Sequence, residues 1–420
     1  MTDNKNPKIF YGYIIVLSIF FIMAIIWGTV ATFGVFLGSL IVEFDWTRAM
    51  VSGASSLREV LFGIFVISTA RLSDRFGPRI VITVCGLLLG LGYLLMSQID
   101  AAWQLYLFYG VITAIGASAY ISLLSIIVRW FEQRRGMMTG IVFSGMGLGI
   151  MIMPPVASWL IDIYEWRTSY IIMGIIALVV FVLSSQFLRP APDGASLLQS
   201  SREYSRGKGT IFVRGELSLR EAIHTKQFWL LCALYFIFLL CLLTIMVHIV
   251  IHATGLGVPA AGAANILAII GGLSIAGMNI VGSTADRIGN RLALTISFVL
   301  MAASLFWLLV AGEVWMLYLF AIAFGFAYGG MQVLFSPIVA DLFGLSSHGV
   351  ILATAAFGGT IGAAIGPIMG GYIFDTTGSY SLAFLISGTL AAIGIMLASG
   401  LRPVVPFVIG RKKNQPSGRI

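Results

Sequence analysis

The hydrophobic pattern of the chain is a series of long apolar runs separated by short polar segments. A bilayer core about 30 Å thick requires about 20 apolar residues per helix. Twelve runs meet this requirement, six on each side of the polar stretch from Arg189 to Gln227. The pattern therefore predicts an all-α membrane protein with twelve transmembrane helices. The expected spans are residues 13–37, 49–70, 80–98, 103–128, 137–161, 168–188, 228–251, 260–283, 292–311, 315–340, 350–373 and 380–400.

The composition indicates the same class of protein. Apolar residues make up 59% of the 420 residues and charged residues only 10%, whereas a soluble domain has roughly 45–50% and 25%. Soluble, disordered and collagen-like classes are therefore excluded. Cys85, Cys232 and Cys241 lie inside apolar runs, which argues against a disulfide framework and a cysteine-based zinc site. The first run is too long for a signal-peptide core, so we expect an uncleaved first span.

The positions of lysine and arginine predict the orientation of the chain. With the amino terminus in the cytoplasm, all but three of the 25 basic residues fall in inner loops, the linker or the tail. The exceptions are Arg48 and Arg167, which fall outside, and Arg58, which lies within a span. This bias predicts a multi-pass protein of the plasma (inner) membrane with both termini cytoplasmic. The net charge of +8 then reflects contact with anionic membrane lipid, and no nucleic acid partner is expected.

The chain divides into four expected segments. They are an N-terminal six-helix bundle at 1–188, a cytoplasmic linker at 189–227, a C-terminal six-helix bundle at 228–400 and a basic cytoplasmic tail at 401–420. The linker is rich in Ser, Gly, Arg and Pro, which is typical of a flexible segment. Near its end, Ser218 and Glu221 fit a capping box, which predicts a short amphipathic helix on the membrane surface.

The two halves of the sequence carry the same landmarks at a nearly constant offset. The loop Asp74–Arg79 recurs 212 residues later as Asp286–Arg291. At an offset of 213, the recurring residues are Gly149, Pro154 and Asp162, which correspond to Gly362, Pro367 and Asp375. Two parallel repeats about an axis along the membrane normal are one known transporter architecture, with the substrate site near the midplane. We therefore expect two pseudo-symmetric six-helix bundles.

These features resemble the major facilitator superfamily. Its best-known signature is an Asp-Arg-x-Gly-x-Arg loop between the second and third spans, repeated between the eighth and ninth, and both copies are present here. Finer stretches are similar to the branch of monocarboxylate porters and oxalate/formate antiporters. They are Phe33–Phe36, Glu43–Ala49, Arg129–Gly136, and Leu219–Ala222 ahead of Phe228 and Trp229. The resemblance extends over the whole chain.

The repeated loops are candidates for a conformational latch. An acid at one helix end can interact with the positive amino terminus of another helix. The resemblance implies that such contacts hold the cytoplasmic side shut in the outward-open state; the alternative is that the loops only enforce topology. The gating residues expected on this basis are Asp74, Arg75, Gly77, Arg79, Asp286, Arg287, Gly289 and Arg291. Pro154 and Pro367 lie in the glycine-rich fifth and eleventh spans, which we interpret as hinge-bearing gating helices.

Two charged residues, Arg58 and Glu59, lie deep within the second span. Arg58 is about 13 Å along this helix, close to the midplane. An intramembrane charge costs at least about 2.5–3.5 kcal/mol, so it requires an aqueous cavity or a partner. Sequence neighbours do not face each other on a helix, so separate partners are expected for the two residues. The functional interpretation is that Arg58 binds a substrate carboxylate and Glu59 carries a proton. The alternative is that both serve packing between the halves, or extend outward to the membrane surface.

His248 and His252 are four residues apart and share one face near the outer end of the seventh span. Zinc would need further ligands that the sequence does not supply nearby, so no metal is expected. His248, the deeper of the two, is a candidate for substrate binding or proton coupling. A satisfied structural histidine is the alternative.

Several uncharged polar residues also lie at membrane depth. Asn265, Asn279 and Gln332 can hydrogen-bond to substrate or join helices together. Tyr120 and Tyr328, in the fourth and tenth spans, are on helices that line the cavity of the resembled fold. Tyrosine offers an apolar wall with one hydroxyl, which suits a small-anion pocket. Core packing is the alternative.

Two positions depart from the resembled branch. Many of its members have an arginine in the eighth span that pairs with the substrate carboxylate, where this chain has Met278. Some members also have a lysine in the first span, where this chain has Gly38. Either Arg58 supplies the missing charge, or the substrate is not a simple monocarboxylate.

The sequence as a whole predicts a secondary active transporter that works by rocker-switch alternating access. The expected substrate is a small organic solute, first an organic anion such as a monocarboxylate, coupled to protons or exchanged for a counter-substrate. No ATP-binding motif is present in the linker, so no cofactor is expected, and no nucleophile constellation indicates an enzyme. A monomer is expected. The alternatives are an exporter of an apolar compound and a non-transporting membrane sensor with the same fold.

Overall fold

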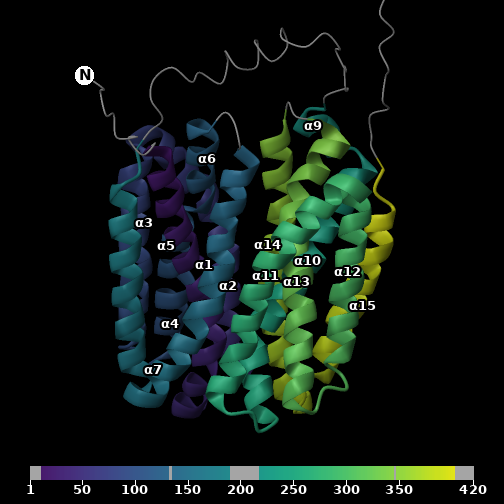
Figure 1. Ribbon diagram of the computed structural model, residues 1–420. Coiled ribbons are helices and arrows are strands. Elements are labelled where there is room, and N and C mark those ends of the chain that lie inside the picture. The colour runs from purple at the N-terminus through teal and green to yellow at the C-terminus, as the bar shows by residue number, and fades with distance from the viewer. Residues whose placement is uncertain (1–10, 132–134, 190–216, 345–346, 403–420) are drawn as a thin grey trace, which may run out of the picture.

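The computed structural model describes residues 11–131, 135–189, 217–344 and 347–402, apart from a few side chains within these ranges, among them that of Asp74. Every regular element in these ranges is a helix (Figure 1). The first eight are α1 (Tyr11–Phe44), α2 (Arg48–Phe76), α3 (Pro78–Met96), α4 (Ala102–Leu105), the π-helix η1 (Tyr106–Ile112), α5 (Thr113–Ala117), α6 (Tyr120–Trp130) and α7 (Arg135–Gln186). The others are α9 (Leu219–Ala222), α10 (Lys226–Gly255), α11 (Ala260–Ile288), α12 (Asn290–Trp307), α13 (Val314–Phe343), α14 (His348–Thr377) and α15 (Ser381–Ser399).

The described residues contain eleven helical segments that are long and apolar enough to cross a membrane. One of them holds two passes. Helix α7 has 52 residues, and a straight helix of that length would extend about 78 Å, more than twice the bilayer core. It bends at Glu165, whose φ of 68° and ψ of 164° are not helical. The expected count of twelve spans is confirmed, but the fifth and sixth are joined at this single bend. The fourth span is built from α4, η1, α5 and α6.

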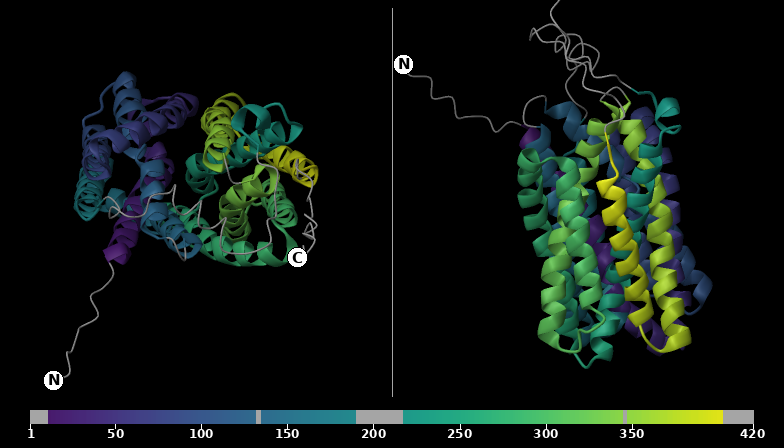
Figure 2. Two further views of the ribbon diagram at one scale, coloured as in Figure 1. Left: turned by 90° about the horizontal axis from the view of Figure 1, so that it is seen from above. Right: turned by 90° about the vertical axis from the view of Figure 1, so that its right-hand side faces the viewer.

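The helices form two groups that lie side by side (Figures 1 and 2). Helices α1–α7 and α10–α15 surround separate apolar cores. Large apolar side chains are also exposed on both groups, including Leu17, Ile171, Leu319 and Met396. In a membrane such side chains contact lipid tails, which are equally apolar. The expected all-α fold of two six-span groups is therefore confirmed.

Equivalent residues of the two groups have the same geometry. A side chain at Gly149 would overlap with the Ala24 carbonyl of α1, and one at Gly362 with the Phe236 carbonyl of α10. The Asp-Arg-x-Gly-x-Arg loops likewise agree, because Gly77 has φ 86° and ψ 147° and Gly289 has φ 91° and ψ 144°. Such positive φ values favour glycine. The sequence repeat is therefore also a structural repeat.

The helices run between two ends of the molecule, which we call the linker end and the far end. At the linker end, the Tyr11 hydroxyl donates to the Phe187 carbonyl (2.9 Å), and the Trp130 indole donates to the Arg189 carbonyl (3.0 Å). Helix α1 begins here, and α6 and α7 end here. The far end is the opposite one, where α2 begins and α14 ends.

The short helix α9 also lies at the linker end, where the Leu217 N–H donates to the Phe343 carbonyl (3.2 Å). The Ser218 N–H donates to Glu221 Oε2 (2.8 Å), and Ser218 Oγ accepts from the Glu221 N–H (3.4 Å). This confirms the expected capping box, and the hydrogen bonds from Ser218 lower the pKa of the Glu221 carboxyl. The rest of the expected linker, residues 190–216, and of the tail, residues 403–420, lies outside the described residues.

Three helix pairs make the main contacts between the two groups: α2 with α14, α7 with α11, and α1 with α10. The close approaches of α2 to α14 run from the far end, where a side chain at Gly371 would lie 2.7 Å from the Ala49 nitrogen, to mid-helix at Gly63 and Thr360. On the linker side of the same pair, Leu72 and Val350 are exposed. The groups are therefore closed against each other at the far end and part toward the linker end.

Candidate functional site

Polar aromatic residues from both groups meet halfway along the helices. This mid-plane cluster consists of Trp27 on α1, Tyr120 on α6, Tyr235 on α10, and Tyr328 and Gln332 on α13. The Trp27 and Tyr120 rings are 6.4 Å apart and meet edge to face. The Gln332 amide lies close to the Tyr120 hydroxyl across the boundary between the groups. The Tyr235 and Tyr328 hydroxyls are close enough to that of Tyr120 to interact with it electrostatically.

Two polar atoms of this cluster have no hydrogen-bond partner among the described residues. They are Trp27 Nε1 and the Tyr328 hydroxyl, and both atoms are buried. An unsatisfied buried polar group costs about 1–3 kcal/mol. Both are hydrogen-bond donors at the boundary between the groups, so a ligand with acceptor oxygens placed here would satisfy them.

The structure brings together three of the residues expected from the sequence, Tyr120, Tyr328 and Gln332. Trp27 and Tyr235 were not expected. Tyr120 and Tyr328 were expected from their position on helices that line the cavity of the resembled fold. A single aromatic residue in an apolar span otherwise gives no sequence signal that separates a binding residue from a packing one.

Two cavities lie along α1 between α7 and α10. Beside Trp27 is an apolar void of about 10 Å³, lined by residues such as Ile150 and Met246, which is about the space of one water molecule. Nearer the far end is a cavity of about 160 Å³ that also reaches α11. We call it the far-end cavity; its polar lining residues are Ser39, Ser158, Asp162 and Thr254. The smaller cavity thus lies beside the mid-plane cluster and the larger one between that cluster and the far end.

Arg58 and Glu59 form a direct ion pair, with Arg58 Nη1 2.5 Å from Glu59 Oε1. The expectation of separate partners is therefore wrong. Neighbouring helix positions point in different directions, but both side chains are long and buried, and the low-dielectric surroundings favour their contact. The Arg58 guanidinium lies 5.9 Å from the Tyr109 ring centre, inside the N-terminal group. Its charge is thus already neutralised in this conformation.

His248 is completely buried and both of its ring nitrogens have partners. Nε2 lies 2.8 Å from the Pro367 carbonyl, and Nδ1 lies 3.2 Å from the Tyr380 hydroxyl. His252, one turn further on, packs edge to face on Tyr380 and Phe384. Among the residues that the structure describes, no group of three or more His, Cys, Asp and Glu could hold a metal ion.

The two expected asparagines do not join the mid-plane cluster. Asn265 is exposed near the far end of α11, and Asn279 is exposed and donates to the Ile275 carbonyl of its own helix (2.7 Å). Met278, at the position of the arginine found in the resembled branch, is buried. Gly38 lines the far-end cavity.

The expected gating loops lie at the linker end. Arg79 donates twice to Gln186 Oε1 (2.7 and 3.1 Å) and Arg291 donates to the Ser399 carbonyl, each within its own group. Asp286 and Arg287 are exposed and form no hydrogen bond or ion pair with another described residue. Arg75 is exposed beside the Phe76 ring, and the Asp74 side chain lies outside the described part of the chain. The latch is therefore not formed by these described side chains in this conformation.

The two expected hinge prolines, Pro154 and Pro367, lie inside α7 and α14 and are buried.

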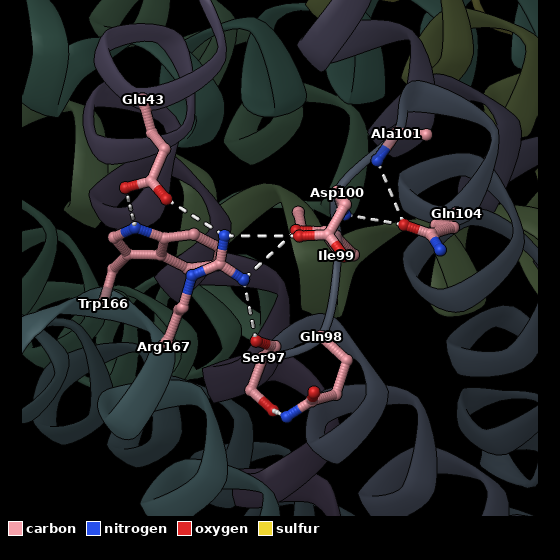
Figure 3. Close-up of polar contacts among 9 residues, drawn as sticks. All are labelled: Glu43, Ser97, Gln98, Ile99, Asp100, Ala101, Gln104, Trp166 and Arg167. Carbon is pink, nitrogen blue, oxygen red and sulfur yellow. Dashed lines mark hydrogen bonds and ion pairs between the residues drawn. The ribbon is translucent and has the colours of Figure 1, made fainter.

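A second polar network, also unexpected, lies at the far end of the N-terminal group (Figure 3). The Trp166 indole donates to Glu43 Oε2 (2.9 Å), and Arg167 Nη2 donates to Glu43 Oε1 (3.0 Å). Arg167 also donates to the Ser97 carbonyl (3.1 Å) and lies 3.6 Å from Asp100. The network ties the end of α1 to α7 and to the loop after α3.

Known proteins agree with this architecture. The family model of the Major Facilitator Superfamily matches residues 17–295 and 273–419. Monocarboxylate transporter 13 of Rattus norvegicus is 27% identical over 402 residues, which cover 94% of this chain and 90% of that protein. The oxalate:formate antiporter of Oxalobacter formigenes is 28% identical over 345 residues, which cover 79% of this chain and 77% of that protein. The uncharacterized MFS-type transporter YhjX of Escherichia coli is 27% identical over 331 residues, which cover 77% of this chain and 80% of that protein.

A solved structure shares the fold. It is a bacterial homolog of the human lysosomal transporter Spinster in an inward-facing and occupied conformation, with a TM-score of 0.72 at 16% identity, and the match covers 94% of this chain and 97% of that one. With the family match over nearly the whole sequence, the chain belongs to the Major Facilitator Superfamily and is a multi-pass membrane transporter.

Proposed function

We propose that the protein is a secondary active transporter of a small organic anion, with monocarboxylates as the first candidates. The observation that carries this proposal is the pair of unpartnered buried donors, Trp27 Nε1 and the Tyr328 hydroxyl, at the boundary between the two groups. A carboxylate supplies acceptor oxygens to both. Relatives named as monocarboxylate transporters and an oxalate:formate antiporter support the same substrate class.

The transport mechanism is rocking of residues 1–188 against residues 228–420 around the mid-plane cluster. The far end and the linker end open in turn, and the present conformation is closed at the far end. The Asp74–Arg79 and Asp286–Arg291 loops meet when the linker end closes, and Pro154 and Pro367 let α7 and α14 bend. Energy comes from a proton gradient or from exchange against a counter-substrate.

The Arg58–Glu59 pair offers a route to proton coupling. A proton on Glu59 removes the negative charge that now faces Arg58, and the freed guanidinium can bind a substrate carboxylate as a charge-assisted partner. Proton and anion would then bind together. His248 is a second proton-binding candidate at the far end.

The distribution of basic residues supports a cytoplasmic linker end, with both termini in the cytoplasm and the far end facing outward. The protein then works as a monomer in the plasma (inner) membrane, with its basic inner loops on anionic lipid.

A second candidate is export of an apolar compound. Met278 is buried where the resembled branch has its arginine, and the void beside Trp27 is lined by apolar side chains. A membrane sensor with this fold would bind its ligand at the same place without releasing it to the other side.

Uptake by proteoliposomes tests the proposal, using a panel of labelled monocarboxylates with and without a pH gradient. A hydrogen bond to a charged group contributes about 1.5–3 kcal/mol, so Tyr328→Phe and Trp27→Phe should raise KM by about 10- to 150-fold. Tyr170→Phe is the matched control, because its hydroxyl is equally buried and unpartnered but lies in the N-terminal core beside Phe36. Binding without uptake would favour the sensor, and uptake of apolar compounds alone would favour the exporter.

A further inference from the structure

The far end is closed by an acid of one group that caps a helix of the other. Asp375, near the end of α14, accepts hydrogen bonds from the first two N–H groups of α2, with Oδ1 3.0 Å from the Arg48 nitrogen and Oδ2 2.8 Å from the Ala49 nitrogen. Thr47 accepts the third, from the Met50 N–H (3.2 Å). A carboxylate at a helix amino terminus satisfies free N–H groups and opposes the positive end of the helix dipole. Asp375 therefore bonds the two groups directly.

The equivalent position of the other repeat is not closed in this way. Asp162 is the counterpart of Asp375, and Ala260, the first residue of α11, is the counterpart of Arg48. Helix α11 begins after Pro259 without a side-chain cap, and Asp162 and Ala260 both line the far-end cavity. Among the described residues, the Asp375 cap is thus the acid–helix contact that closes the far end.

The side chain of Arg48 continues this contact into the protein. Its Nη1 donates to the Tyr380 hydroxyl (2.7 Å), and its guanidinium lies 3.4 Å from the centre of the Phe374 ring. Tyr380 is buried just before α15 and also contacts His248. A continuous chain of contacts therefore runs from the exposed Asp375, through Arg48 and Tyr380, to the buried His248.

The partners of His248 define where its hydrogen lies. The Pro367 carbonyl only accepts, so Nε2 carries the hydrogen and donates to it. In the neutral ring Nδ1 is then an acceptor, and the Tyr380 hydroxyl donates to it. The Tyr380 oxygen in turn accepts from Arg48. His248 Nε2, the Tyr380 hydroxyl and Arg48 Nη1 each donate to one acceptor in this chain, and this pattern requires a neutral His248.

A second proton on His248 is incompatible with this arrangement. It would occupy Nδ1, where the Tyr380 hydroxyl hydrogen already points, and it would add a positive charge to the site of Arg48. The charged and titratable groups that face His248 are Arg48 from α2, Asp375 from α14, Tyr380 before α15, and His252 on its own helix. Asp375 is the one acid among them, and both of its carboxylate oxygens already accept hydrogen bonds from the first N–H groups of α2.

We propose that His248 is a proton-binding site that controls the far-end closure through Tyr380, Arg48 and Asp375. A proton taken up by Nδ1 turns the Tyr380 hydroxyl away, loosens Arg48 and releases α2 from Asp375. Acid on the far side then favours the conformation that is open at that end. The inference rests on the alternating access proposed above and adds the residues through which external protons act on it.

Distances between spin labels at the far end test the proposal without any substrate. Labels are attached to Val42→Cys at the end of α1 and Glu313→Cys before α13, both exposed and in different groups, with the three native cysteines replaced by alanine. Spectra are compared at about pH 7.5 and about pH 5.5, on either side of the ordinary histidine pKa of about 6.5. One proton changes the open-to-closed ratio by at most about tenfold per pH unit, and we expect a rise of about tenfold over this interval.

Four variants separate the proposal from its alternatives. We expect His248→Gln to abolish the pH response and His252→Gln to keep it. We expect Asp375→Asn to show the longer distance already at the higher pH, and Asp162→Asn, the control, to resemble the parent. An unchanged pH response in His248→Gln, or a closed far end in Asp375→Asn, would overturn the proposal. A pH-dependent distance in a protein that takes up no solute would contradict the proposed transport function. It would leave the proposed control of the far-end closure by His248 standing.

Discussion

Arg58 and Glu59 lie inside the N-terminal group, where their side chains are only 3% and 11% exposed. Removing two such charges from water costs several kcal/mol for each ion, and their mutual contact offsets much of this cost. Each residue therefore depends on the other for its place in the fold. The same dependence makes the pair sensitive to a proton, because neutralising one partner leaves the other charge unpaired.

Glu59→Gln leaves the Arg58 guanidinium buried without a counter-charge. We expect the free energy of unfolding to fall by about 3–5 kcal/mol, measured as a lower melting temperature in detergent. Replacing both residues, as Arg58→Met with Glu59→Leu, removes the buried charge and should recover most of the loss. A monocarboxylate that stabilises Glu59→Gln more than the parent would identify Arg58 as the carboxylate anchor. A Glu59→Gln variant as stable as the parent would contradict the buried pair.

The sequence shows which residues are unusual more readily than it shows which residues contact each other. Charges at membrane depth are rare, so Arg58 and Glu59 stand out in any apolar span. Their contact could not be foreseen, because helix periodicity fixes the direction of each Cβ but not the path of a long side chain. Trp27 could not be foreseen for another reason: an aromatic residue in an apolar span looks the same whether it faces lipid, core or substrate.

At the scale of helices, glycines set the closest contacts. Gly145 and Gly149 lie one turn apart on α7, and a side chain at either position would overlap with a backbone carbonyl of α1, that of Phe20 or of Ala24. Small residues four apart allow two membrane helices to approach until their backbones touch. Since there is no water to expel between helices in lipid, this packing supplies much of the cohesion of the group.

Gly149→Ala therefore forces α1 and α7 apart. We expect the free energy of unfolding to fall by about 1–3 kcal/mol through overpacking, seen as a lower melting temperature in detergent. Gly140→Ala on the same helix is the matched control, because a side chain there meets no atom within 4 Å. Alanine is the better helix former by about 0.5–1 kcal/mol, so the control should be unchanged or slightly stabilised. Equal losses in both variants would show that the close contact is not what matters.

The elements themselves followed largely from hydropathy, because a membrane admits few other structures. The spans and the Ser218–Glu221 cap were foreseen from residue type and spacing. The bend of α7 was not, because Glu165 adopts a positive φ that is uncommon for residues other than glycine. Gly378, which lies 213 residues later, also has a positive φ of 70°, but its ψ of 7° differs from the 164° of Glu165.

For the whole molecule, the repeat predicts two groups of the same structure. The groups differ where equivalent positions of the two repeats hold different residues. Gly371 lets α14 approach the start of α2, whereas its counterpart in the first repeat is Ser158, which lines the far-end cavity and has a buried, unpartnered hydroxyl. The repeat pointed to Asp162 and Asp375 as a pair, but not to the fact that one of them caps a helix. Which end is closed depends on contacts between residues more than 300 positions apart, such as Asp375 and Arg48, and these were beyond a reading of local sequence.

In the proposed rocking mechanism the linker end closes when the far end opens, and we expect the repeated loops to hold it closed. Asp375 shows at the far end how this chain uses an acid at a helix amino terminus, and Asp286 carries the same chemistry at the linker end. An acid near a helix amino terminus stabilises the conformation that holds the two together by about 0.3–2 kcal/mol. Asp286→Asn should therefore raise the ratio of linker-open to linker-closed molecules by about two- to thirtyfold, measured as spin-label distances between Ile80→Cys on α3 and Leu292→Cys on α12. Glu313→Gln, which removes an exposed acid at the far end, should leave these distances unchanged. If Asp286→Asn also leaves them unchanged, the loops set topology alone, and the energy that closes the linker end must come from the glycine-rich faces of α7 and α14.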